Sequence, residues 1–286
     1  MTETSAQLDE SGIGIVGVGL IGGSVAAGLR KAAYQGKIVG FGRSEERLRK
    51  AQSLGLLSDF ATEPEPKIHE LSLIVVCTPV DRIVEDVRHF ANAARPGTII
   101  TDVGSVKESL CRELKDLSNG EVTFVGSHPL AGSEKNGFEH ADANLYRDRL
   151  CFITPFAETP PETLRRVVLF WSALGMKLQH VSPAEHDRLM SVTSHAPHLI
   201  AAAISLLLEE EFKSFTGTGF QDTTRIASGD PGLWRAIMMQ NREQMTGTLE
   251  KFREILDEFT SAIESGDAQK LEQLLELAKT RRDSLV

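Results

Sequence analysis

The chain has few cysteines, and none is placed to build a disulfide framework. Its 286 residues include only Cys77, Cys111 and Cys151, and no two of these form a CxxC pair. An odd, scattered set of this kind is typical of reduced thiols in the cytoplasm. The start of the chain, 1–11, is polar and acidic, without the basic and apolar regions of a secretory signal peptide. We therefore expect a cytoplasmic protein.

Basic clusters and long apolar runs are missing as well. The formal net charge is −9, and no segment gathers lysine and arginine into a patch. Because nucleic-acid binding requires such a patch to neutralise phosphates, the composition argues against a nucleic-acid partner. The longest apolar stretch, 199–208, is interrupted by Ser205 and is shorter than the ~20 residues that a helix needs to cross a bilayer. We expect no membrane partner.

The first half of the chain alternates short apolar runs with helical patterns. Five runs predict buried strands, at 13–16, 38–41, 73–77, 99–101 and 122–125. Two stretches between them predict helices, at 44–54 and 107–117. The alternation is typical of an α/β domain in which helices cover both faces of a parallel sheet.

The pattern continues to residue 181 and then changes. We expect a strand at 150–154, a helix at 161–174 and a strand at 176–181, with Pro161 in the first helical turn and Gly175 after the last. Beyond Ser182 only helices are predicted, at 183–190, 197–211, 231–240, 242–264 and 268–285. The predicted organisation is a sheet domain, 1–181, followed by an all-α domain, 182–286.

The last helices carry apolar residues at helical spacing, among them Leu249, Phe252 and Leu256. Such a stripe faces a core or packs on a second subunit. Because several long helices here have no other predicted partner, we expect a homodimer.

A glycine-rich segment follows the first predicted strand and opens a helix. Its GxGxxG pattern is formed by Gly17, Gly19 and Gly22, with Leu20 and Ile21 inside it. The first glycine permits a tight turn, the second lets the backbone approach a pyrophosphate, and the third lets the helix pack on the strand. The N–H groups at the helix start can then bind the anion. With a second strand about 20 residues further on, the context predicts a Rossmann-type dinucleotide site.

The end of the second predicted strand bears on the choice of coenzyme. An acid commonly stands there to bind the ribose 2′-hydroxyl, but this chain has Gly42 followed by Arg43 and Ser44. An arginine and a hydroxyl suit a 2′-phosphate. We expect NADP, with NAD as the alternative if Arg43 is a solvated loop residue and Ser44 only caps the next helix.

Other predicted strands also end in chemically rich segments, 77–80, 102–107 and 126–137. Strand ends in such sheets face the coenzyme crevice. The residues expected to bind coenzyme from these segments are Thr78, Pro79, Val80, Asp102 and Gly104. The segment 126–137 reads GSHPLAGSEKNG, with histidine, serine, glutamate, lysine and asparagine between two glycines.

Taken together, these motifs resemble the prephenate/arogenate dehydrogenase family. The resemblance rests on the GxGxxG start, 102–107, SHPLAGSEKNG, His186-Asp187, the segment SHAPH at 194–198, and 222–234, and it covers nearly the whole chain. It implies oxidation of prephenate or arogenate with concurrent decarboxylation, on the route to tyrosine.

The resemblance also implies roles for particular residues. His128 is expected to accept the proton of the substrate's ring hydroxyl, as a neutral histidine can near neutral pH. Ser105 is expected to bond this histidine or to lie beside the nicotinamide. Because the substrate carries at least two negative charges, Arg225 is expected to bind a carboxylate and His195 to contact the substrate. Weaker substrate candidates are Glu134, Asn136 and Lys107.

Alternatives remain at this stage. Arg225 could instead pair with Asp222 or Asp230 at the surface. A metal reading of the histidines at 186, 195 and 198 lacks a second metal motif, so we expect no metal. His198 is then a packed residue, and His186-Asp187 a capping and hydrogen-bonding pair.

Two rival functions also fit a two-domain chain of this kind. A β-hydroxyacid dehydrogenase would need a lysine on the helix at 197–211, which has none. A non-catalytic NADP sensor would not need His128, Ser105 and Arg225 together. Between prephenate and arogenate, Arg149 favours the keto acid and Asp148 the amine, so the substrate stays open.

Overall fold

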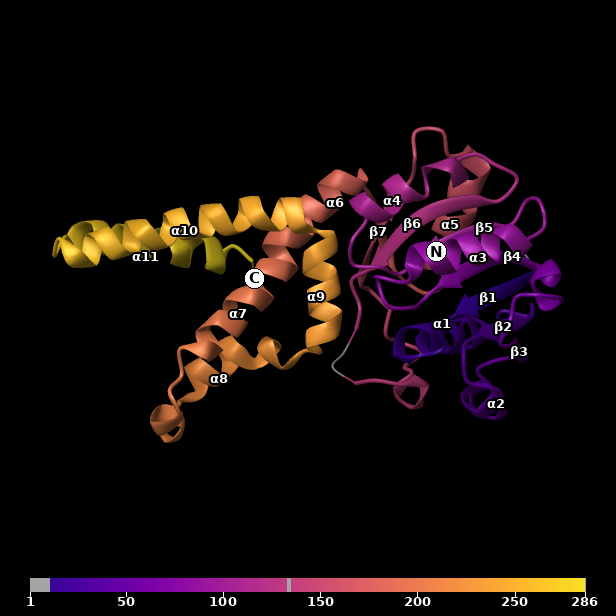
Figure 1. The fold of residues 1–286 in the computed structure, drawn as a ribbon, viewed down its shortest axis with the longest axis horizontal. Coiled ribbons are helices and arrows are strands. Elements are labelled where there is room, and N and C mark those ends of the chain that lie inside the picture. Colours follow the sequence, from indigo (N-terminus) through magenta and orange to yellow (C-terminus); the bar gives the residue numbers. More distant parts are fainter. Residues whose placement is uncertain (1–10, 133–134, 286) are drawn as a thin grey trace, which may run out of the picture.

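The first half of the chain folds around one eight-stranded sheet (Figure 1). The computed structural model describes residues 11–132 and 135–285. The strands lie in the order β3-β2-β1-β4-β5-β6-β7-β8. Their bounds are β1 Gly12–Val16, β2 Ile38–Phe41, β3 Asp59–Ala61, β4 Leu71–Val76, β5 Ile99–Asp102, β6 Thr123–Pro129, β7 Leu150–Thr154 and β8 Lys177–His180.

The sheet is mostly parallel, with one exception. Strands β1 to β6 pair in parallel, whereas β7 runs antiparallel to β6 with Gly126 opposite Thr154. The predicted parallel sheet is confirmed, β8 again pairs with β7 in parallel, and the β6–β7 pair is the one antiparallel pair among the described strands. The connection from β6 to β7 contains a single 3₁₀ turn, Phe138–His140, in its described part. Without a crossover helix the chain does not return across the sheet, so the next strand enters from the opposite end.

Helices cover both faces of the sheet, as predicted. They are α1 Leu20–Lys31, α2 Glu45–Ser53, α3 Ile83–Ala93, α4 Glu108–Glu113 and α5 Pro161–Ala173. One core lies under α1 and α5, with Leu29 and Trp171 fully buried. A second core on the other face is built around α3 and α4, with Val87 and Leu114 fully buried. A strand between two such cores is apolar on both sides, which is why the runs could be found in the sequence.

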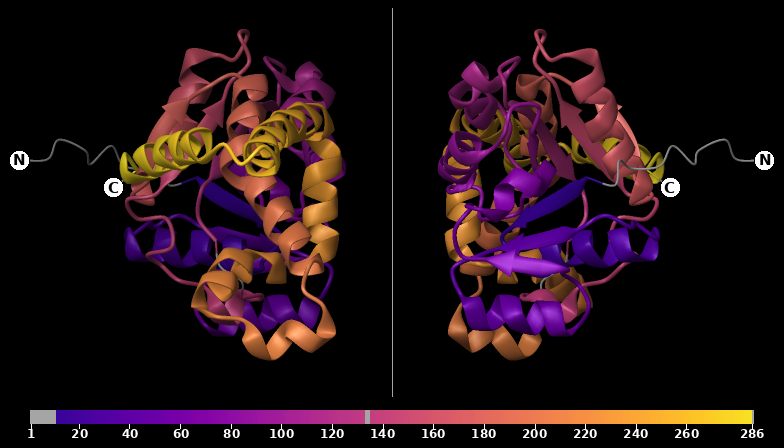
Figure 2. Two further views of the ribbon diagram at one scale, coloured as in Figure 1. Left: turned by 90° about the vertical axis from the view of Figure 1, so that its left-hand side faces the viewer. Right: turned by 90° about the vertical axis from the view of Figure 1, so that its right-hand side faces the viewer.

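The second half is helical. Its helices are α6 Pro183–Met190, α7 Ala196–Leu206, α8 Thr218–Thr224, α9 Pro231–Gln240, α10 Arg242–Glu264 and α11 Ala268–Asp283. A π-helical turn, Ser191–His195, joins α6 to α7. Figure 1 shows α6 against the sheet domain, while α10 and α11 form an arm that points away from it. In the left view of Figure 2 this arm projects in front of the sheet domain.

The continuous helix Pro183–Leu206 is long and apolar enough to cross a membrane by length and composition alone. The sequence predicted two shorter helices here, but the π-helical turn Ser191–His195 joins them into one. Yet His186 and Asp187 are almost completely buried on this helix, and both are hydrogen-bonded within the protein. Because the helix buries paired polar groups within the fold, its length and composition are weak evidence for a membrane span.

Large apolar side chains on the helical half lie open in the single chain. Leu206 is 88% exposed, Phe215 80% and Ile263 64%.

Candidate functional site

The glycine-rich loop lies where the strand order reverses, between β1 and β4. Gly17 adopts a φ of +89°, and a Cβ there would lie 2.9 Å from the carbonyl of Cys77. A Cβ on Gly22 would lie 2.3 Å from the carbonyl oxygen of Gly17. Only glycine allows both this turn and this close approach of α1 to the strand.

The same loop offers donors on its open side. A Cβ on Gly19 would meet nothing within 4 Å, so the backbone there is accessible. Gly19 caps α1 without a side-chain bond, and the first-turn N–H groups of Leu20 and Ile21 have no intrahelical acceptor. Within the described part of the chain, the buried hydroxyl of Thr78 also lacks a hydrogen-bond partner. These groups fit the pyrophosphate of a dinucleotide.

The loop after β2 carries exposed polar residues. Arg43 and Ser44 are exposed, and Ser44 Oγ accepts a hydrogen bond from the backbone N–H of Arg47 at 3.3 Å. Ser44 therefore caps α2, which was the alternative to a 2′-phosphate contact for this residue. A Cβ on Gly42 would meet only Leu48 side-chain atoms, at 3.6 Å or more. The glycine is thus not required by packing.

The loop after β4 joins the two halves of the chain. Pro79 is exposed and Val80 buried, and the Val80 carbonyl accepts a hydrogen bond from Gln240 Nε2 at 3.2 Å. Because Gln240 ends α9, the helical half is fixed against the predicted coenzyme crevice.

Asp102 and Lys107 form an ion pair that is wholly buried, with both side chains 0% exposed. Asp102 also accepts hydrogen bonds from the N–H groups of Gly104, at 2.8 Å, and Ser127, at 3.0 Å. This burial bears on two predictions. Asp102, the last residue of β5, has no exposed atom with which to contact a coenzyme, and Lys107 has none with which to contact a substrate. The pair instead holds the end of β5 against the strand that carries His128.

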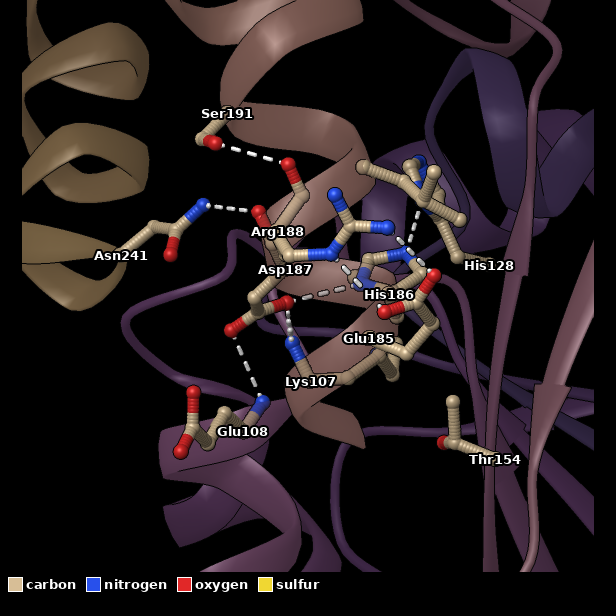
Figure 3. Close-up of polar contacts among 12 residues, drawn as sticks. Lys107, Glu108, His128, Thr154, Glu185, His186, Asp187, Arg188, Ser191 and Asn241 are labelled. Atoms are coloured by element: carbon tan, nitrogen blue, oxygen red, sulfur yellow. Dashed lines mark hydrogen bonds and ion pairs between the residues drawn. The ribbon is translucent and has the colours of Figure 1, made fainter. Parts of the chain in front are cut away.

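His128 lies near the end of β6 and is hydrogen-bonded to a second histidine (Figure 3). Its Nδ1 is 2.8 Å from His186 Nε2, and His186 Nδ1 is 2.7 Å from Asp187 Oδ1. His128 is 8% exposed, whereas His186 is fully buried. The three side chains form a line that starts at the crevice and ends in the interior.

Asp187 is held by N–H groups. Oδ1 accepts from the backbone of Lys107 at 2.7 Å, and Oδ2 accepts from the backbone of Glu108 at 2.9 Å (Figure 3). With the bond to His186, the carboxylate accepts three hydrogen bonds, so it caps the start of α4 rather than its own helix.

These acceptors assign the protons along the line. Since Asp187 is surrounded by donors, His186 Nδ1 must carry the hydrogen that it shares with Asp187. A neutral His186 then has a bare Nε2, which accepts from His128 Nδ1–H. The remaining nitrogen of His128, Nε2, keeps its lone pair. This tautomer makes His128 a proton acceptor on its crevice side.

Burial governs the ionisation of these groups. It holds the pKa of His128 well below the ordinary 6.5, and nearby His186 and Lys107 act in the same direction. Burial also lowers the pKa of His186 to about 2. Both histidines are therefore neutral at neutral pH. Burial raises the pKa of Asp187, and the two backbone N–H groups oppose that shift.

His195 follows in the π turn and is 1% exposed. Asn241 Nδ2 donates to His195 Nδ1 at 3.0 Å and to the Asp187 carbonyl at 2.9 Å. His195 Nδ1 is then an acceptor, so Nε2 carries the hydrogen, and that buried atom has no partner within the described residues. Burial lowers the pKa of His195 to about 4. A neutral donor is thus fixed beside the His128 line.

His198 stacks on Trp234, with ring centres 3.6 Å apart and an angle of 15° between the planes. Its Nδ1 is buried and without a partner in the part of the chain described. The packed role predicted for His198 agrees with this stack. The unpaired nitrogen is a polar feature that packing does not explain.

The remaining candidate residues are spread more widely. Ser105 is half-buried, and where the structure is described it makes no hydrogen bond to His128, whose Nδ1 is bonded to His186. Arg225 is exposed at the start of a 3₁₀ turn, and within 11–132 and 135–285 it forms no ion pair with Asp222 or Asp230. Asn136 lines a hollow beside α2. Glu134 lies outside the described residues.

Sequence reasoning missed part of the constellation. His186 and Asp187 were predicted to be a capping and hydrogen-bonding pair, which they are, but their link to His128 was not predicted, and Asn241 was not singled out. The adjacent His-Asp pair on a helix was the available signal, but its partner lies 58 residues away. Among the described residues, no three acidic, histidine or cysteine side chains are grouped to hold a metal ion.

Family comparisons cover almost the whole chain. The family described as "Prephenate dehydrogenase, nucleotide-binding domain" matches residues 25–180, and "Prephenate dehydrogenase, dimerization domain" matches 182–277. The prephenate dehydrogenase of Bacillus subtilis is 31% identical over 95% of this chain and 75% of its own length. The cyclohexadienyl dehydrogenase of Zymomonas mobilis is 32% identical over 94% of each chain.

Solved structures agree with these matches. The prephenate dehydrogenase from Aquifex aeolicus, in complex with hydroxyphenyl propionate and NAD⁺, has a TM-score of 0.91 at 32% identity and covers 98% of this chain and 100% of its own. The Synechocystis arogenate dehydrogenase has a TM-score of 0.85 at 29% identity, covering 96% of this chain and 100% of its own.

Proposed function

Since the chain belongs to the prephenate dehydrogenase family, we propose that its His128 site catalyses the oxidative decarboxylation of prephenate to 4-hydroxyphenylpyruvate. The observation that carries this proposal is the hydrogen-bonded line from His128 through His186 to Asp187. It leaves a neutral nitrogen at the crevice, where a hydroxyl must lose its proton.

The proton step follows from the tautomer. His128 Nε2 accepts the hydroxyl proton as the ring carbon becomes a carbonyl and gives up a hydride, which a bound nicotinamide coenzyme would accept. The carbon–carbon bond to the ring carboxylate then breaks, its electrons make the ring aromatic, and carbon dioxide leaves. The imidazolium of His128 can return the proton to the new phenolic oxygen. Charge on the imidazolium is stabilised through His186 by the Asp187 carboxylate.

Two donors are proposed to bind the substrate. The buried Nε2–H of His195 suits an oxygen of the substrate, because it has no partner inside the described protein. Arg225 supplies a guanidinium without an ion pair in the described chain, which suits a carboxylate. Glu134 and Asn136 are proposed as weaker candidates for substrate binding. Ser105 is proposed to lie beside the nicotinamide.

For the coenzyme we propose NADP. The pyrophosphate is held by the open backbone at Gly19 and the first turn of α1, with the Thr78 hydroxyl as a further donor. Gly42 leaves no carboxylate to repel a 2′-phosphate, and Arg43 and Ser44 follow it. The double variant Gly42→Asp with Arg43→Ala should reverse the preference in kcat/KM, since the space beside Leu48 admits the new side chain.

We further propose a cytoplasmic homodimer with a domain boundary between Val181 and Ser182. The exposed apolar residues of the helical half would be covered by a second copy. Light scattering at micromolar concentration should give twice the 31.3 kDa chain mass. A clean monomer would leave those residues without a partner and contradict the proposal.

The second candidate substrate is arogenate. The Synechocystis relative carries that name, and Asp148 and Arg149 are both exposed before β7, so neither charge decides the choice. Parallel assays with prephenate and arogenate test it. A higher kcat/KM with prephenate supports the proposal, and the opposite order overturns it.

A further inference from the structure

Four basic side chains surround α2, but they differ in their partners. Arg49 pairs with Glu45 at 2.6 Å, and Lys50 pairs with Glu139 at 3.1 Å. Arg43 and Arg47 are exposed, and neither forms an ion pair with any described residue. Two cations therefore lie close to the end of β2 without an ion pair among the described residues, and Arg47 is attracted at longer range by the Glu139 carboxylate.

The backbone places Arg47 beside the loop that carries Arg43. Its N–H donates to Ser44 Oγ, so Arg47 lies in the first turn of α2. Side chains on a helix lean toward its N-terminus, and the guanidinium of Arg47 lies beside Gly137, where a Cβ would be 3.6 Å from Arg47 Nη2. Ser44 Oγ uses a lone pair for Arg47, and its own hydrogen remains available to an acceptor.

A buried ring supports the Arg47 guanidinium. Arg47 Cζ lies 5.5 Å from the centre of the Phe138 ring, which is 2% exposed. Arginine placed over a ring in this way keeps its edge N–H groups for in-plane acceptors. Arg47 also lines the hollow beside α2, together with Asn136 and Gly137. Of the two acids in this hollow, Glu139 is bound by Lys50, and Glu46 is exposed.

We propose that Arg47 is a specificity-determining residue that binds the coenzyme's 2′-phosphate together with Arg43 and the Ser44 hydroxyl. This rests on the proposed use of NADP. A phosphate offers several oxygens, so one guanidinium leaves acceptors for a second. A free 2′-hydroxyl carries no charge and gains little from Arg47.

The test compares Arg47→Ala with the matched control Arg49→Ala. Both changes remove one arginine from the exposed side of α2, but Arg49 is already paired with Glu45. Binding of adenosine 2′,5′-bisphosphate and of 5′-AMP is measured by calorimetry on the intact protein, and KM for NADP and NAD in steady-state assays. Arg47→Ala should weaken binding of the 2′-phosphate probe about tenfold or more and leave 5′-AMP unchanged, while Arg49→Ala changes neither.

The outcomes separate this inference from the proposed coenzyme. If the unchanged protein binds adenosine 2′,5′-bisphosphate no better than 5′-AMP, the NADP proposal itself fails. If it prefers the 2′-phosphate probe but Arg47→Ala behaves like Arg49→Ala, only the role of Arg47 is overturned. Equal losses with both probes in Arg47→Ala would show general damage to α2 and would also contradict the role.

Discussion

Replacing Asp187 by asparagine tests how the tautomer of His128 is set. Asp187→Asn keeps the size of the side chain but replaces one acceptor oxygen by an NH₂ group. The carboxylate now accepts from the Lys107 and Glu108 backbones and from His186 Nδ1. An amide cannot accept all three, because only its oxygen is an acceptor.

The two ways of placing the amide have different consequences. If its NH₂ takes the place of Oδ1, the Lys107 N–H loses its acceptor, and His186 must accept at Nδ1 and carry its hydrogen on Nε2. His128 then accepts at Nδ1 and loses its lone pair at Nε2, so the base is gone. If the NH₂ takes the place of Oδ2, the Glu108 N–H is left without an acceptor, which costs about 1–3 kcal/mol, but the tautomer of His186 is kept. In both placements the negative charge that stabilises the His128 imidazolium is lost, so we expect kcat to fall by ~10²–10⁴, with a modest loss of thermal stability.

The assay measures kcat and KM for prephenate alongside the melting temperature. Glu185→Gln is the matched control, since it makes the same chemical change two residues earlier on α6, where Glu185 pairs with Arg188 at the surface. The control should keep normal turnover. A folded Asp187→Asn enzyme with normal kcat would refute the tautomer argument. If the loss of kcat is fully explained by the fraction of unfolded enzyme, Asp187 acts only by capping α4.

Three further results are expected. His128→Asn should lower kcat by ~10²–10⁴ and abolish the acidic limb of the pH profile. In the unchanged enzyme this limb lies below pH 6.5, because burial depresses the pKa of His128. An unaltered pH profile would contradict the role of His128. Arg225→Ala should raise KM for prephenate about tenfold or more and leave coenzyme binding unchanged, whereas an unchanged KM with reduced stability would point to a structural arginine. Acid should weaken the fold, because unfolded His186 and His195 take up protons below pH 6.5, whereas their folded pKa values are about 2 and 4. Urea unfolding should show that about 2 kcal/mol of unfolding free energy is lost per histidine between pH 6.5 and 5. Equal stability at both pH values would contradict the burial of the two histidines as neutral groups.

Local features were the most predictable from sequence. The glycine loop follows from steric needs within six residues, and the buried strands follow from runs that are apolar on both faces. Pro183–Met190, Pro231–Gln240 and Arg242–Glu264 match their predicted helices because prolines, caps and periodicity all agree. The edge strand Asp59–Ala61 was missed, since three half-buried residues carry no periodic signal.

Features that depend on long-range packing were not predictable in this way. The hydrogen bond between His128 and His186 joins β6 to α6, and no local sequence pattern predicts it. Asp102 was predicted to contact the coenzyme because a strand ends there; the strand does end at Asp102, but the ion pair with Lys107 buries its carboxylate.

The central claim is that this chain oxidises and decarboxylates prephenate with His128 as the proton acceptor. The most direct measurement mixes the purified protein with prephenate and NADP or NAD, and follows reduced coenzyme by absorbance together with carbon dioxide and 4-hydroxyphenylpyruvate. We expect the three products in equal amounts, with higher kcat/KM for NADP, and almost none with His128→Asn. Coenzyme reduction without carbon dioxide, or full activity in His128→Asn, would contradict the account.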